Sequence, residues 1–390
     1  MKRRVFLIVA DSLGVGALPD AERFGDVGTH TLDHVVESVE SLDVPRLSAL
    51  GLGNVPGVRR LGRVATPAAA FGRMAEVSAG KDTSTGHWEM MGVVVPTAFP
   101  TFPEGFPRAL VEAFVERAGL DGVLGNEVAS GTEIIERLGP EHLRTGRPIL
   151  YTSADSVFQL AAHEEHFGLE RLLDCCRVAR ELLDEHHVAR VIARPFVGAP
   201  GGFERTYNRR DFSLEPTETS SLVRLDRAGV PVIGVGKIQD IFAGVGVPRS
   251  VHTEGNRDGM AKTTELARTL ENGLVFVNLV DFDMLFGHRR DPVGYARALE
   301  EFDRDLVAFE RHLRPDDVVF VTADHGNDPT FTATTDHTRE YVPVLAFGER
   351  VRAAQLGTRA SFADLGATVE ELFGLVPGGP GASFARELES

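Results

Sequence analysis

Residues 5–11 read VFLIVAD, a run of six apolar residues that ends at an aspartate. A short apolar run of this kind predicts a buried strand of a parallel sheet. Further runs of the same kind lie at 188–193, 230–235, 274–280, 318–322 and 342–347. Amphipathic, helix-like stretches separate them, among them 220–228, 294–312 and 362–375. This alternation predicts an α/β fold in which a mainly parallel sheet lies between helices.

The chain is long enough for two domains, because its 390 residues exceed the roughly 150 residues of an average domain. Its composition changes at 96–107 (PTAFPTFPEGFP), where prolines recur, and again at 198–216, which is rich in Gly, Pro and Arg. We therefore expect a core made of residues 1–98 and 217–390. A smaller inserted α/β (α+β) domain is expected at 99–216.

Overall charge and cysteine content narrow the class of protein. The net charge of −16 argues against a nucleic-acid binder and against a binder of anionic membranes. Cys175 and Cys176 are adjacent and are the only cysteines, so the chain has no disulfide framework. The apolar run 5–10 is too short for a signal peptide or a membrane span. We expect a cytoplasmic protein.

Three predicted strands end at acidic residues. Asp11 ends the first, Asp283 follows the strand at 274–280, and Asp324 follows the strand at 318–322. Ligands of open α/β sheets gather at the carboxyl ends of strands, where three carboxylates would repel one another without a cation among them. The alternative is that each aspartate caps the helix or turn that follows it.

Histidines accompany these aspartates. His288 lies five residues after Asp283, His325 directly follows Asp324, and His337 comes twelve residues later. A mixed set of Asp and His ligands favours Mn²⁺, Zn²⁺ or Fe²⁺ over Ca²⁺, which prefers oxygen ligands alone. Three aspartates and three histidines exceed the needs of one ion, so the sequence predicts two.

A small polar segment, GKDTSTGHWEMMG at 80–92, passes into a helical pattern. A hydroxyl in the first turn of that helix would lie among free backbone N–H groups, at a place that suits a phosphoryl group. A hydroxyl held on a divalent cation is also activated as a nucleophile. The alternative is an ordinary Ser or Thr N-cap beside a loop lysine.

Taken together, Asp11 and the motifs at 80–92, 281–288 (DFDMLFGH), 322–328 (TADHGND) and 335–341 (TDHTREY) resemble the phosphopentomutases, a family of the alkaline phosphatase superfamily. The motifs occur in the family's order over nearly the whole chain. The inserted segment resembles the family's cap domain at 151–157 (YTSADSV), 161–165 (AAHEE), 191–198 (VIARPFVG) and 205–211 (RTYNRRD). The resemblance implies an alkaline-phosphatase-like core that carries a cap.

The resemblance also implies an isomerase that interconverts α-D-ribose 1-phosphate and D-ribose 5-phosphate, and likewise the 2-deoxyribose phosphates. Its cofactors would be two Mn²⁺ ions, with glucose 1,6-bisphosphate or ribose 1,5-bisphosphate as activator. Thr85 would become a phosphothreonine between the ions. One ion would be held by Asp11, Asp324 and His325, and the other by Asp283, His288 and His337. Its partners would be small sugar phosphates, and no obligate protein partner is inferred.

The family's pattern further implies the residues that bind the substrate. Arginines bind phosphate bidentately, and Arg194, Arg205 and Arg209 are expected, in preference to Arg210, on the phosphate that does not react. Ser153 and Asp155 are expected at the sugar, and Lys237 is expected to contact a phosphate. The alternatives are that the arginines are solvated cap surface and that Asp155 only caps a helix. A closing cap would keep water from the phosphothreonine.

Three other functions stay open at this point. A phosphate- or sulfate-ester hydrolase of the same superfamily would use the same metal ligands. A relative of the cofactor-independent phosphoglycerate mutases would use a serine nucleophile, for which Ser84 is placed. A non-catalytic sugar-phosphate-binding protein on a degenerate enzyme fold would lack ligands or the nucleophile, whereas this chain has all of them.

Overall fold

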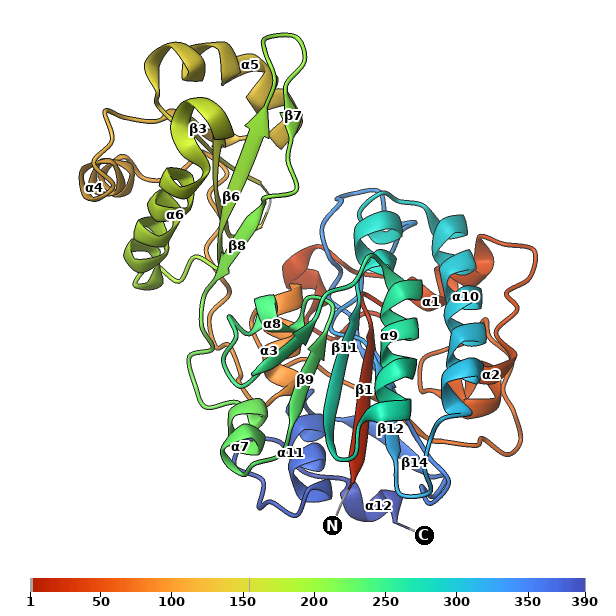
Figure 1. Ribbon diagram of the computed structural model, residues 1–390. Coiled ribbons are helices and arrows are strands. Elements are labelled where there is room, and N and C mark those ends of the chain that lie inside the picture. The colour runs from red at the N-terminus through yellow and green to blue at the C-terminus, as the bar shows by residue number, and fades with distance from the viewer. Residues whose placement is uncertain (1–2, 154, 390) are drawn as a thin grey trace. The chain divides into compact units, whose positions relative to one another are not determined.

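The structure is a computed structural model that describes residues 3–153 and 155–389. Its internal contacts divide the chain into two compact units (Figure 1). The first unit joins residues 1–98 to 216–390, and the second comprises 99–215. The α/β class predicted from the sequence is confirmed. The role of the second unit as a cap stays a prediction.

In the described part of the first unit, eight strands form one sheet in the order β10-β9-β11-β1-β12-β13-β2-β14. Neighbouring strands are parallel except where β13 lies between β12 and β2 and runs antiparallel to both. The strands are β1 (Arg4–Ala10), β2 (Ala70–Met74), β9 (Val232–Val235), β10 (Arg249–Val251), β11 (Gly273–Leu279), β12 (Val318–Thr322), β13 (Val342–Phe347) and β14 (Gln355–Arg359). The sequence analysis did not predict β2, β10 or β14.

These strand directions decide which loops meet. Because β1, β9, β11 and β12 are parallel, the residues that follow them emerge at one edge of the sheet. The segment that precedes β13 arrives at that edge as well, since β13 runs the opposite way. The end of β2, which leads toward residues 75–82, also lies there. The candidate ligands and the nucleophile segment are therefore brought to the same side.

Helices flank this sheet in two packed groups (Figure 1). The first group contains α1 (Thr31–Glu37), α2 (Pro45–Leu50), α9 (Asn256–Thr269) and α10 (Pro292–Glu310). The second contains α3 (Thr83–Met90), α7 (Ser221–Arg227), α8 (Ile238–Ile241), α11 (Ala363–Leu372) and α12 (Ala385–Leu388). Shorter helices are η1 (Ala21–Phe24), η2 (Leu52–Asn54) and the π-helix η4 (Phe282–Gly287). Strand β1 is buried along its whole length, as its continuous apolar run predicted.

The second unit has its own sheet and two apolar clusters. Helices α4 (Arg108–Arg117) and α6 (Leu169–Asp184) contribute to one cluster, and α5 (Gly131–Thr145) contributes to the other. The strands are β3 (Leu124–Val128), β4 (Ile149–Thr152), β5 (Val157–His163), β6 (Arg190–Val197), β7 (Glu204–Arg205) and β8 (Arg210–Ser213), and the π-helix η3 spans Glu164–Gly168. Adjacent residues of β5, such as Leu160 and Ala161, belong to different clusters, as the alternation of a strand requires.

A buried ion pair anchors the start of β1 and leads to a first prediction. Arg4 Nε donates to Asp317 Oδ1 at 2.9 Å, and both side chains are at most 2% exposed. Substitution Asp317→Ala leaves a buried guanidinium without its partner, so the free energy of unfolding should fall by about 3–5 kcal/mol. Urea titration of the metal-free protein, followed by the fluorescence of the single tryptophan, Trp88, measures this loss.

The neighbouring Asp316 supplies the matched control. Asp316 pairs with Arg350 on the surface, where both side chains are more than half exposed. Substitution Asp316→Ala should change stability little, because exposed ion pairs contribute little. Equal losses in the two variants would contradict the anchoring role of Asp317.

Candidate active site

Asp11, Asp324 and His325 form the first group of possible metal ligands. One ligand atom from each lies within 4.8 Å of the others, and all three residues are buried. His325 Nε2 lies 3.5 Å from Asp11 Oδ1 and 3.2 Å from Asp324 Oδ2. The structure thus brings together the three residues that the sequence analysis assigned to one ion.

The backbone after β1 positions the two carboxylates of this group. Ser12 has a positive φ of 71°, an uncommon conformation for a residue with a side chain, and such strain is frequent at functional sites. The Ser12 N–H donates to Asp324 Oδ1 at 3.1 Å. From β11, Asn278 Nδ2 donates to Asp11 Oδ2 at 2.7 Å. Each aspartate therefore has one oxygen fixed by a hydrogen bond.

The buried negative charges of this group favour a bound cation. Burial, together with the neighbouring charges of Asp324 and Asp283, raises the pKa of Asp11 to about 7. Burial would also raise the pKa of Asp324, but His325 and His87 outweigh it and hold that pKa well below the ordinary range. Asp11 Oδ1 is buried and accepts no hydrogen bond from a described residue. A divalent ion would satisfy this oxygen and relieve the repulsion.

A second group contains Asp283, His337 and His325, again within 4.8 Å of one another. His288, which the sequence analysis placed with Asp283 and His337, stands beside this group: its Nε2 lies 3.0 Å from Asp283 Oδ2. The rings of His288 and His337 are 4.8 Å apart, and those of His325 and His337 are 4.2 Å apart. His325 thus lies between the two groups. Burial opposes ionisation of Asp283, yet His337 and His288 hold the pKa of Asp283 well below its ordinary range.

The sequence analysis missed Arg290, which ties the two segments of this second group together. Its guanidinium donates to Gly287 O at 2.8 Å and to Asn327 Oδ1 at 2.5 Å. It also donates to Thr334 O at 3.0 Å and to Asp336 O at 3.1 Å, directly before His337. Asn327 in turn donates to Asp283 Oδ1 at 2.7 Å. No sequence pattern signals this role, because the acceptors are mostly backbone carbonyls.

The hydroxyl of Thr85 lies in the first turn of α3 and is fully buried. The N-cap of α3 is Asp82, which accepts N–H bonds from Ser84 and Thr85 at 3.0 and 3.2 Å. Thr85 Oγ1 donates to Asp82 Oδ2 at 2.5 Å. Because an aspartate caps the helix, the alternative of an ordinary Ser or Thr N-cap is wrong. Asp82 was also missed, although its place three residues before Thr85 suits a cap.

The first two turns of α3 pack directly on the first ligand group. A Cβ at Gly86 would lie 2.0 Å from the carbonyl oxygen of Asp324, so only glycine allows this approach. His87 Nδ1 lies 3.1 Å from Asp324 Oδ2, and Thr83 Oγ1 lies 3.2 Å from His325 Nε2. Thr85 therefore stands among residues that touch Asp324 and His325.

Five of the six residues predicted to bind substrate line one cavity of about 290 Å³ in the second unit: Ser153, Asp155, Arg194, Arg205 and Arg209. Arg194 Nε donates to Gln159 Oε1 at 3.1 Å, and Arg190 lies 3.6 Å from Asp155. Tyr151 also lines the cavity, and its buried hydroxyl makes no hydrogen bond with a described residue. The sixth residue, Lys237, belongs to the first unit, where it is exposed at the N-cap of α8.

Comparison with known proteins adds the family. A family model described as the metalloenzyme superfamily matches residues 3–377. The phosphopentomutase of Anaeromyxobacter sp. (strain K) is 57% identical over 388 residues and covers 100% of both chains. The phosphopentomutase of Symbiobacterium thermophilum is 57% identical over 389 residues, which cover 99% of this chain and 98% of that one. The chain belongs to the phosphopentomutase family.

The protein is therefore an enzyme of the isomerase class and a member of a metalloenzyme superfamily. The resemblance drawn from the motifs is confirmed. The PH0037 protein from Pyrococcus horikoshii shares the fold, with a TM-score of 0.51 at 16% identity over 96% of this chain and 98% of that one. Among the described helices, none is both long and apolar enough to span a membrane.

The contacts of Arg290 lead to a second prediction. Substitution Arg290→Ala should loosen the segments that carry Asp283, His288 and His337, and should weaken metal binding by about 10–100-fold. Titration of the metal-free protein with Mn²⁺, followed by calorimetry, measures the change. Arg289→Ala is the matched control, because Arg289 is exposed and makes no hydrogen bond with a described residue. An unchanged affinity in Arg290→Ala would disprove the role.

Proposed function

We propose that this enzyme interconverts α-D-ribose 1-phosphate and D-ribose 5-phosphate, and the corresponding 2-deoxyribose phosphates, through a phosphothreonine at Thr85. One observation carries the proposal. The buried Thr85 hydroxyl is hydrogen-bonded to Asp82 and lies in the first turn of a helix that packs on Asp324 and His325. A hydroxyl at such a helix terminus can receive a phosphoryl group, since the positive end of the helix dipole favours negative charge there.

The candidate ligands fit two divalent ions, which we propose to be Mn²⁺. Asp11, Asp324 and His325 would hold one ion, and Asp283, His288 and His337 would hold the other, with His325 near both. The mixture of carboxylate and imidazole ligands supports a borderline divalent metal rather than Ca²⁺. When bound, the ions would neutralise phosphoryl oxygens and help to deprotonate the attacking hydroxyl.

The residues of this chain suggest how the phosphoryl group moves. Asp82 orients the Thr85 hydroxyl and accepts its hydrogen bond, so that the oxygen can attack phosphorus as the bond from phosphorus to the sugar oxygen breaks. In this priming step the phosphorus belongs to a sugar bisphosphate such as glucose 1,6-bisphosphate or ribose 1,5-bisphosphate, and the proton of Thr85, which Asp82 accepts, passes to the released sugar oxygen. A hydroxyl of the substrate monophosphate would then attack the phosphothreonine, so that its bond to the Thr85 oxygen breaks, Thr85 regains a proton and a sugar bisphosphate forms. The restored Thr85 would take the other phosphoryl group from that bisphosphate, which releases the isomeric monophosphate and regenerates the phosphothreonine.

We further propose that the cavity of the second unit binds the phosphate that does not react. Four arginines (Arg190, Arg194, Arg205 and Arg209) line it together with Ser153, Asp155 and Tyr151. Burial, and after it the neighbouring Arg209, lowers the pKa of Arg194, which indicates crowded cations that an anion would relieve. Arg209 is held by Asp211 at 2.6 Å and is thus oriented before substrate arrives. Lys237 is proposed as a further phosphate contact.

Two alternative functions, a mutase with a serine nucleophile and a hydrolase, can be distinguished from the proposed one. The Ser84 hydroxyl makes no hydrogen bond with a described residue, whereas Thr85 donates to Asp82, which favours threonine over serine as nucleophile. A hydrolase would release inorganic phosphate without forming the isomeric sugar phosphate. A coupled assay that finds only free phosphate would contradict the proposed isomerisation.

Peptide mapping by mass spectrometry tests the nucleophile. After incubation of the Mn²⁺-loaded enzyme with glucose 1,6-bisphosphate, we expect one phosphoryl group on Thr85. Thr85→Ala should carry none and should lose at least about 10³-fold in kcat, because no other hydroxyl of the described residues donates to Asp82. Ser84→Ala should keep most of its activity. A phosphoryl group on Ser84, or full activity in Thr85→Ala, would overturn the mechanism.

Steady-state kinetics test the cavity of the second unit. Arg194→Ala should raise the KM for ribose 5-phosphate by about 10–100-fold, because a charge-assisted, bidentate contact to phosphate is lost. Arg210→Ala is the control, since Arg210 is exposed and does not line the cavity. If both variants raised KM equally, the cavity would not be the phosphate site.

A further inference from the structure

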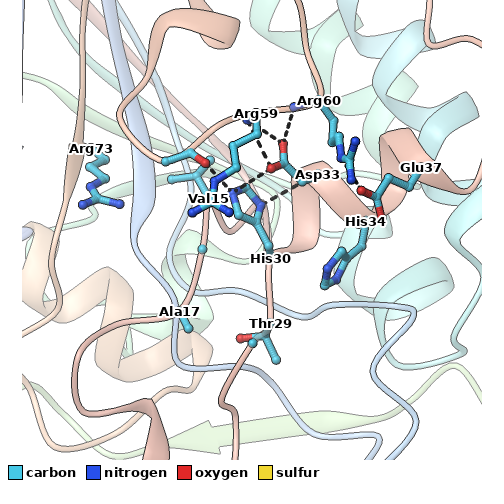
Figure 2. Close-up of a pocket in the computed structure, with 13 residues that line it drawn as sticks. Val15, Ala17, Thr29, His30, Asp33, His34, Glu37, Arg59, Arg60 and Arg73 are labelled. Carbon is cyan, nitrogen blue, oxygen red and sulfur yellow. Dashed lines mark hydrogen bonds and ion pairs between the residues drawn. The ribbon is translucent and has the colours of Figure 1, made fainter.

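The first unit contains a cavity of about 680 Å³, which is larger than the cavity of the second unit (Figure 2). Its residues play no part in the proposed reaction. Neither Thr85 nor any of the six candidate metal ligands lines it. Its walls come from the loop after β1, from α1, from the segment that precedes β2, and from β2 itself. The charged residues among them are Arg59, Arg60, Arg73, Asp33 and Glu37, accompanied by His30 and His34.

Both carboxylates of this cavity are already engaged. Glu37 forms an ion pair with Arg60, and Figure 2 shows the two side chains beside each other. Asp33 accepts backbone N–H bonds at 3.0–3.1 Å from Arg59 and Arg60, drawn as dashed lines in Figure 2. His30 also faces Asp33, with Nε2 3.3 Å from Oδ2. Neither carboxylate forms an ion pair with Arg59 or Arg73.

Arg73 is oriented without a carboxylate partner among the described residues. Its guanidinium lies over the ring of Tyr341, 3.7 Å from the centroid, and its Nε donates to Thr358 Oγ1 at 3.1 Å. Its Nη1 reaches the backbone at Gly57, where an added Cβ would lie 2.8 Å away. A glycine with a φ of +101° at position 57 therefore leaves room for this arginine at the cavity wall. A stacked, fixed guanidinium loses little freedom when it binds an anion.

The side chain of Arg59 is exposed, and it makes no hydrogen bond or ion pair with a described residue. Among the residues that line the cavity, three arginines and two carboxylates leave one net positive charge, on a chain whose total is −16. Such a local excess attracts an anion that the rest of the surface repels. Arginine, with its planar fork of donors, suits phosphate in particular.

We propose that this cavity binds a small organic phosphate, with Arg59 and Arg73 on its phosphate group. The volume lies within the range of small-molecule sites and exceeds what inorganic phosphate alone would fill, so the ligand carries a further polar body. The cavity wall also borders the metal loops. His34 Nδ1 lies 2.5 Å from Asp328 Oδ2, in the segment between His325 and His337. The phosphate bound here is distinct from the one that reacts.

Equilibrium dialysis of the Mn²⁺-loaded, full-length enzyme against radiolabelled glucose 6-phosphate tests the proposal. We expect wild-type protein to bind one more molecule than the Arg59→Glu variant, or to bind it at least about tenfold more tightly at that site. Turnover of ribose 5-phosphate should stay within about twofold in the variant, which also shows that it is folded. Arg73→Gln should lose the same binding event.

Arg63→Glu is the matched control, because Arg63 is exposed in the same segment but does not line the cavity. It should keep the additional binding event. Identical stoichiometry and affinity in wild type, Arg59→Glu and Arg63→Glu would overturn the proposal. Displacement of the label by citrate as readily as by unlabelled glucose 6-phosphate would overturn the assignment to phosphate.

Discussion

Repulsion between buried carboxylates at one edge of the sheet is the constraint on which the rest of the site depends. Asp11, Asp283 and Asp324 are buried together, and burial with like charge moves the pKa of Asp11 to about 7. Four histidines (His87, His288, His325 and His337) offset part of this charge, and divalent ions would offset the remainder. One oxygen of each aspartate is fixed by a donor, from Ser12 for Asp324, Asn278 for Asp11 and Asn327 for Asp283.

The same constraint explains how closely the nucleophile segment packs. A phosphoryl acceptor must lie against the cation site, so α3 approaches Asp324 closer than any side chain would allow at Gly86. Asp82 both caps this helix and binds the hydroxyl of Thr85, which joins helix stability to the placement of the reacting oxygen. Arg290 joins the segments of Asp283 and His337 by donating to the carbonyl oxygens of Gly287 and Asp336.

Much of this could be predicted from the sequence, for reasons that differ between residues. The strand at Arg4–Ala10 is buried on both faces, so its apolar run is continuous and legible. Strand β2 (AFGRM) is short and contains a glycine and an arginine, so its sequence has no apolar run that predicts a strand. The candidate ligands stood out because Asp and His recur directly after strands. Asp82 and Arg290 did not, since they act through other groups of the protein.

The sequence by itself determined the α/β class, the family, and the residue types that suit a divalent metal and a phosphoryl group, because these depend on local patterns and motif order. Only the tertiary structure decided which ligands share a neighbourhood. It placed His325 between the two ligand groups, joined Thr85 to Asp82, and left Arg59 and Arg73 at a cavity without an ion pair to any described carboxylate. These relations arise from strand direction and from packing between segments far apart in the chain, which no local pattern encodes.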